Sequence, residues 1–228
     1  MARLPQFRDS LTAEQIAEGM NRALQNASRL AEDAATLLMT ARLPSSTALS
    51  ILSIEESGKV ALLRQMAISS DQKEWQTNWK AYRSHTKKNL LWILGDLVRQ
   101  GKTKLEDFGE VADPKSEHPD VLDNLKQLCL YTDCFGGAKW SSPSDIDLKE
   151  LAPYLLKMAQ VFASPKKVTA KEVELWRKHL LPVKNEPQAS QTQAVAAWYQ
   201  EMKLYGLTDQ DLERVEAFLN VPSPRTQA

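Results

Sequence analysis

Apolar residues return every three or four positions along most of the chain, which is the spacing of amphipathic helices. Thr12, with Gln15 three residues later, has the form of a capping box, so a first helix should begin directly after it. Leu43–Ser46 contains a proline and two serines and should separate the first helix from the second. The pattern predicts three long helices, over about 13–41, 47–68 and 71–100.

Beyond Gly101 the pattern loosens and prolines divide it into shorter segments. Pro153 should break or kink one of these segments, and Leu181–Gln191 has the composition of a linker. The expected shorter helices cover about 121–131, 145–163, 169–180, 192–204 and 208–220.

Short connections between long helices imply antiparallel neighbours, so the expected fold class is all-α. We expect a helical bundle over residues 12–163 and a C-terminal helical extension with a flexible tail over residues 164–228.

The second predicted helix is apolar on most of its circumference, yet charges lie in its middle. Glu55 and Glu56 precede Lys59 by four and three residues, so either carboxylate can reach the lysine. Buried charges cost several kcal/mol each unless they are paired. Gly58 lies among them and costs roughly 1 kcal/mol in a helix relative to alanine, which indicates that another helix or a side chain approaches closely there.

The third predicted helix carries Arg83, His85 and Lys88. If it is antiparallel to the second, Glu55 or Glu56 can orient His85 while the lysines face an anion. A histidine among cations suits acid–base chemistry at a phosphodiester, where a cation stabilises the developing charge. The same residues also fit a buried network that only ties the bundle together, and spacing alone leaves both interpretations open.

Composition limits the partners and cofactors. Lysine plus arginine equal aspartate plus glutamate at 29 each, so contact with nucleic acid or an anionic membrane needs a local patch. No apolar run approaches the ~20 residues that span a bilayer, and Met1–Ser10 lacks a signal-like core, so we expect a cytoplasmic protein without a membrane partner. The spacing of Cys129 and Cys134 matches neither a zinc site nor a redox pair, so two reduced thiols, no metal and no cofactor are expected.

Four segments of the chain, two of them around the charged residues, resemble the AbiV family of phage abortive-infection proteins. This family belongs to the HEPN superfamily. The shared signature is an isoleucine-glutamate-glutamate-x-glycine-lysine run followed by histidine-x-x-lysine. The resemblance covers about Thr12 to Gln160. The segments that carry it are Ala48–Lys59, Arg83–Lys88, Leu125–Asp133 and Trp140–Pro143.

The resemblance implies a HEPN-like bundle, a homodimer and a role in bacterial defence against phage. Many HEPN proteins are metal-independent endoribonucleases, with RNA as the partner. In that case His85 is the acid or base, and Arg83 and Lys88 stabilise phosphate. Glu55 or Glu56 would then orient the histidine, and Lys59 would hold the glutamates ionised.

One feature of the sequence departs from the HEPN ribonuclease motif. That motif separates arginine from histidine by several residues, whereas Ser84 alone lies between Arg83 and His85. The alternative is a non-enzymatic helical module that binds a phage or host protein, with the charged cluster purely structural.

Overall fold

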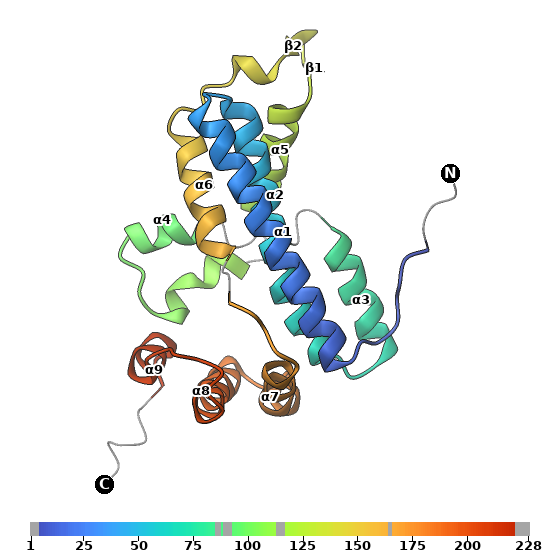
Figure 1. Cartoon of the computed structure of the whole chain (residues 1–228), viewed down its shortest axis with the longest axis vertical. Helices are drawn as coiled ribbons and strands as arrows, with labels where there is room; N and C mark the ends of the chain where they lie inside the picture. The colour runs from blue at the N-terminus through green and yellow to red at the C-terminus, as the bar shows by residue number, and fades with distance from the viewer. Residues whose placement is uncertain (1–4, 85–87, 89–92, 113–116, 164–165, 222–228) are drawn as a thin grey trace.

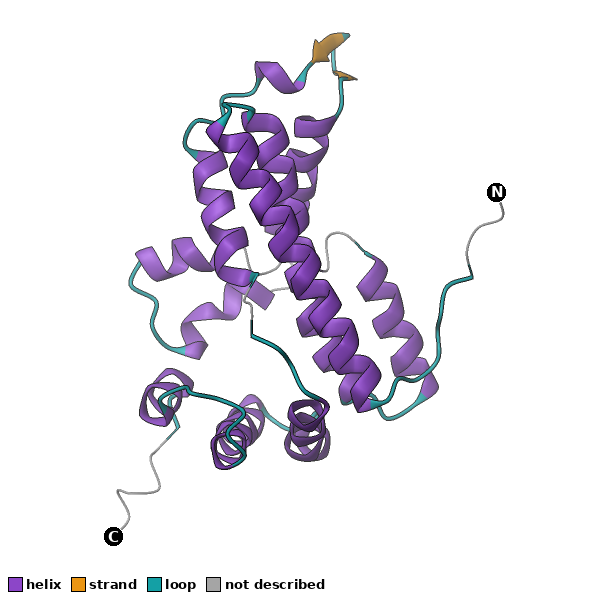
Figure 2. Cartoon of the chain, viewed as in Figure 1, coloured by secondary structure: helices purple, strands orange, loops and turns teal. Residues whose placement is uncertain are grey.

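The computed structural model describes residues 5–84, 88, 93–112, 117–163 and 166–221. Helices dominate these residues, and the only sheet among them is one antiparallel pair of three-residue strands (Figures 1 and 2). The all-α prediction is therefore confirmed. In chain order the elements are α1 (Ala13–Met39), α2 (Leu43–Ala67), α3 (Gln72–Arg83), α4 (Leu94–Arg99), the 3₁₀ helix η3 (Leu105–Ala112), α5 (His118–Leu130), β1 (Asp133–Phe135), β2 (Lys139–Ser141), η4 (Pro143–Asp145), α6 (Leu151–Phe162), α7 (Ala170–Leu180), η5 (Leu181–Val183), α8 (Gln188–Leu204) and α9 (Leu212–Leu219).

The pair α1 and α2 forms the centre of the fold. The Thr12–Gln15 capping box that opens α1 is formed in both directions. Small residues line the contact between the helices, so their backbones lie close together. Ser46 Oγ donates to Ala34 O at 2.8 Å and Ser53 Oγ donates to Ala27 O at 2.7 Å, which ties α2 directly to the main chain of α1.

Helices α5 and α6 pack against one half of α2 and complete the bundle (Figure 1). Ile51 and Ile54 of α2 are buried there against Leu122 of α5 and Leu155 of α6. The other half of α2 contacts α3, whose Trp75 and Trp79 are buried. One long helix, α2, thus packs against α1, α3, α5 and α6.

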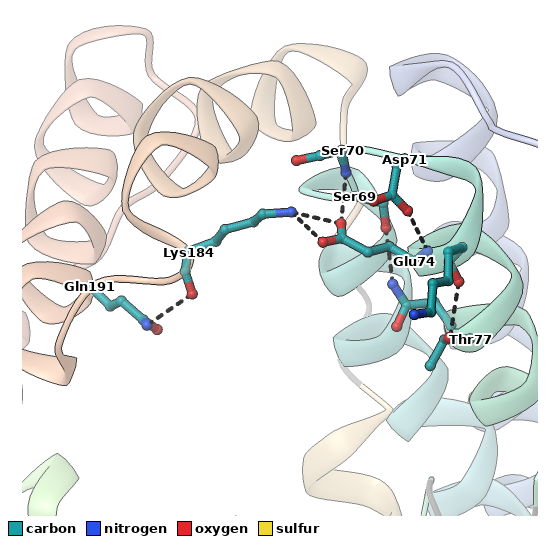
Figure 3. Close-up of polar contacts among 9 residues, drawn as sticks. Ser69, Ser70, Asp71, Glu74, Thr77, Lys184 and Gln191 are labelled. Carbon is teal, nitrogen blue, oxygen red and sulfur yellow. Dashed lines mark hydrogen bonds and ion pairs between the residues drawn. The ribbon is translucent and has the colours of Figure 1, made fainter.

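Figure 1 shows the C-terminal helices α7, α8 and α9 almost end-on; α7 lies nearest to α1 and α2, and α9 contacts η3. Asn21 of α1 exchanges two hydrogen bonds of 2.8 Å with the main chain of Val168, and α7 contacts both α1 and α2. Lys184, which follows η5, reaches Glu74 of α3 with Nζ–carboxylate distances of 2.6 and 2.7 Å (Figure 3). The extension is therefore attached to the bundle at several separate points.

The third helix differs most from its prediction. A continuous helix to Gln100 was expected, but α3 ends at Arg83 and Ser84 is extended (φ −78°, ψ 137°). A separate helix, α4, follows at Leu94–Arg99. Nothing in the sequence at Ser84 marks this end, because neither glycine nor proline lies there.

Other boundaries moved for local reasons. Pro153 causes no break, because it lies in the first turn of α6, where no intrahelical N–H is required. Asp211 caps α9, so this helix begins later than the predicted 208. The antiparallel pair β1–β2 was not predicted from the sequence. No helix among the described residues is both long and apolar enough to cross a bilayer.

Candidate functional site

A buried ion pair joins α2 to α5 at the centre of the bundle. Lys126 Nζ donates to Glu55 Oε1 at 2.5 Å and to Asp123 Oδ1 at 2.6 Å. The side chains of Glu55 and Lys126 are only 3% and 4% exposed, whereas Asp123 is half-buried at 26%. Burial opposes the charge of Lys126, but its bonds to Asp123 and Glu55 outweigh that effect and raise its pKa.

A second ion pair lies on α2 toward α3. Lys59 Nζ is 2.5 Å from Glu56 Oε1 and 5.3 Å from the ring centroid of Tyr82. The side chains of Lys59 and Glu56 are 18% and 19% exposed, so this pair is more open to solvent than the Glu55 pair. Burial raises the pKa of Tyr82, and the charge of Lys59 opposes the rise.

Lys88 meets α2 at Gly58. A Cβ placed on Gly58 would overlap the Lys88 carbonyl group, with the carbonyl carbon 3.0 Å away and Cα 3.1 Å away. The close approach expected at Gly58 is confirmed, and the group that approaches is the main chain of Lys88. Any larger residue at Gly58 would therefore displace Lys88.

The side chain of Lys88 lies in the charged cluster, and the residue is 7% exposed. Burial lowers the pKa of Lys88, Glu55 and Glu56 counteract the shift, and Lys59 and Lys126 add to it. The structure thus brings four of the predicted residues together, with Lys126 as a fifth charge. We call Glu55, Glu56, Lys59, Lys88 and Lys126 the charged cluster.

The remaining predicted site residues are Arg83 and His85. The Arg83 guanidinium donates to the main-chain oxygens of Phe7 and Trp79 and lies 4.8 Å from the Trp79 ring centroid. Arg83 therefore holds the N-terminal segment against α3. His85 lies outside the described residues.

Two other kinds of chemistry find little support in the described part of the chain. It contains no group of three or more histidine, cysteine or acidic side chains that could hold a metal ion. Both cysteines are free, as predicted, and burial raises the pKa of Cys129 to about 11. Such a thiol stays protonated at neutral pH and is a poor nucleophile.

Sequence reasoning missed Lys126 as a member of the cluster. A signal was present, because Lys126 follows Asp123 by one helical turn on a face that carries Leu122 and Cys129. Its partner Glu55 is 71 residues away, and pairing over that separation depends on how α2 and α5 pack.

Residues 15–164 match the family model HEPN_AbiV, described as AbiV. The chain belongs to the AbiV family. The match includes the charged cluster and ends just before α7, so the C-terminal helices lie outside the AbiV region. The searches of curated proteins and of solved structures found no match.

Proposed function

We propose that this AbiV protein is an abortive-infection effector of antiphage defence that acts in the cytoplasm by cleaving RNA or otherwise blocking translation. Two observations support the proposal. The chain matches AbiV over the segment that holds the charged cluster. The cluster also contains a lysine, Lys88, whose protonated form is disfavoured by burial.

The burial of Lys88 is the observation on which the proposal rests. Burial lowers its pKa, so the protonated form is held at an energetic disadvantage. An apolar side chain of similar volume would avoid this penalty. A lysine kept in such a place has a physical rationale if its charge is needed, for example to stabilise a phosphate during transfer.

The cluster then divides into two parts with different tasks. Glu55 and Lys126 are enclosed and hold α2 against α5. Lys88, Glu56 and Lys59 would contact or orient the reacting groups, with His85 as the acid or base and Arg83 as a further candidate phosphate ligand. A homodimer would allow two such clusters to face one RNA.

A second candidate function is a non-enzymatic module that binds a phage or host protein. The burial of Glu55 and Lys126, at 3% and 4% side-chain exposure, and of Lys88, at 7% exposure, favours it, because charges buried to this degree reach a substrate only if the surrounding packing opens. In that case His85→Ala lowers the melting temperature but leaves the growth effect of the folded protein intact.

Expression of the wild type and of His85→Ala in the bacterial host, with host growth and RNA integrity as readouts, separates the two functions. The RNA-cleaving version predicts growth arrest and RNA fragments for the wild type and neither for His85→Ala. His179→Ala, in the C-terminal extension, is the matched control and should behave like the wild type. A folded His85→Ala protein that remains toxic would remove the catalytic role.

A further inference from the structure

A cavity of about 540 Å³ lies between α2 and the C-terminal helices. Its volume is within the range of small-molecule sites, roughly 300–1,000 Å³. Helix α2 forms one wall, and α7 and α8 supply most of the other. The cavity therefore needs both the AbiV bundle and the extension that follows it.

Aromatic rings form much of the wall. Trp176 and Trp198 meet edge-to-face at 5.0 Å, and Trp198 meets Tyr199 at 4.7 Å. Phe162 of α6 also lines the cavity. Aromatic walls of this kind bind flat rings through stacking and edge contacts.

The lining carries two cations, Arg64 and Lys166, and one carboxylate, Glu172, which pairs with Arg64 at 3.0 Å. Arg64 lies 5.4 and 5.1 Å from the ring centroids of Trp176 and Trp198. Within the described residues its guanidinium makes one hydrogen bond, to Glu172 at 3.0 Å, and a guanidinium carries five N–H donors.

Helix α2 also contributes Ser57 to the wall of the cavity. Ser57 is 6% exposed and its Oγ is fully buried, so it forms an uncharged part of the wall.

We propose that this cavity binds a small organic anion with a planar ring, the chemical class that includes nucleoside monophosphates. The ring contacts Trp176 and Tyr199, which are the half-buried members of the aromatic wall, and the anionic group contacts Arg64. Glu172 holds Arg64 in place for this contact.

The site is distinct from the charged cluster. Ser57 and Glu55 are two residues apart, which places them about 200° apart around α2. The cavity and the Glu55–Lys126 pair therefore lie on opposite sides of one helix. The inference does not depend on the proposed function, because ligand binding here requires no catalysis.

Binding can be measured on the full chain with 8-anilinonaphthalene-1-sulfonate, an aromatic anion with a planar naphthalene ring whose fluorescence rises in apolar surroundings. N-phenyl-1-naphthylamine is its uncharged counterpart. The proposal predicts saturable binding of one anion per chain, at least tenfold tighter than binding of the amine. Displacement by adenosine 5′-monophosphate would identify a nucleotide as the ligand, and its absence would indicate another aromatic anion.

Two variants locate the bound probe. Ala61 is exposed and lines the cavity, so Ala61→Phe should fill the space and abolish binding, whereas Gln65→Phe, exposed on the same helix outside the lining, should not. Arg64→Gln should weaken binding of the anion at least tenfold and leave binding of the amine unchanged. Arg22→Gln, at an exposed arginine, is its control. Absence of saturable binding, or equal binding by folded Ala61→Phe and wild type, would overturn the proposal. Because Ala61 makes no ion pair, that comparison holds even if Arg64→Gln fails to fold.

Discussion

Lys126 and Lys88 are buried lysines of one cluster, but their surroundings shift their pKa values in opposite directions. Asp123 and Glu55 raise the pKa of Lys126 against the effect of burial, whereas burial prevails at Lys88 and lowers its pKa. The stabilisation from Lys126 is complete below the pKa of an unfolded lysine and is lost as pH rises through its raised folded value. For Lys88 the effect on stability has the opposite sign, because its pKa is lowered in the folded state. Its positive charge therefore reduces the free energy of unfolding at neutral pH.

Lys126→Met tests this contrast. Removing one partner of a buried pair leaves Glu55 uncompensated, so we expect a loss of about 3–5 kcal/mol in the free energy of unfolding. Lys88→Met, a change of the same chemistry, should lose much less or gain stability. Urea unfolding at neutral pH measures both, and equal losses for the two variants would contradict the contrast.

Helix α2 depends on a glycine in its interior. Gly58 lowers helix propensity, yet it allows the main chain of Lys88 to lie against the helix. The contact positions Lys88 after α3 has ended, so one residue of α2 determines where a distant cation enters the cluster.

Gly58→Ala should therefore destabilise the protein although alanine is the better helix former. Overpacking costs typically about 1–3 kcal/mol, which exceeds the gain of roughly 1 kcal/mol from propensity. Gly19→Ala in α1 is the control, because its Cβ would meet only the flexible end of the Leu63 side chain at 3.3 Å. Thermal unfolding should show a lower midpoint for Gly58→Ala alone; a higher one would refute the role of this contact.

The sequence predicted elements well where the signal was local. The Thr12 capping box and the apolar stripe of α1 lie within one segment, and both predictions held. The end of α3 at Arg83 was not predictable in this way, because the periodicity continues beyond it. The charges of α2 could be recognised from the sequence because their neighbours are apolar. The contact of Lys126 with Glu55 could not, because it depends on how α5 packs on α2.

The molecule as a whole combines an AbiV bundle with a C-terminal extension that is attached through both apolar and polar contacts. Lys184 and Glu74 form one of these contacts, and the Ser70 N–H also donates to Glu74 at 2.7 Å (Figure 3). The pair joins two parts of the chain 110 residues apart, so it stabilises the arrangement that encloses the cavity.

This contact should make the stability of the protein sensitive to acid. Hydrogen bonds from Lys184 and Ser70 lower the pKa of Glu74, so its contribution is present above the unfolded value of 4.5 and is lost as pH falls through the lower folded value. Glu74→Gln should therefore lower the urea midpoint at neutral pH, with the difference from the wild type shrinking on acidification. Glu18→Gln, in an exposed pair on α1, is the control; a difference independent of pH would contradict this account.

The central proposal is that the charged cluster carries the defence function and is not only a structural network. Phage plaquing on cells that express wild type, Lys88→Met or the control Lys178→Met, an exposed lysine, tests it most directly. The account predicts that Lys88→Met accumulates as a folded protein with a melting temperature at or above that of the wild type, yet gives no protection, while Lys178→Met protects fully. A folded Lys88→Met protein that protects as well as the wild type would contradict the claim.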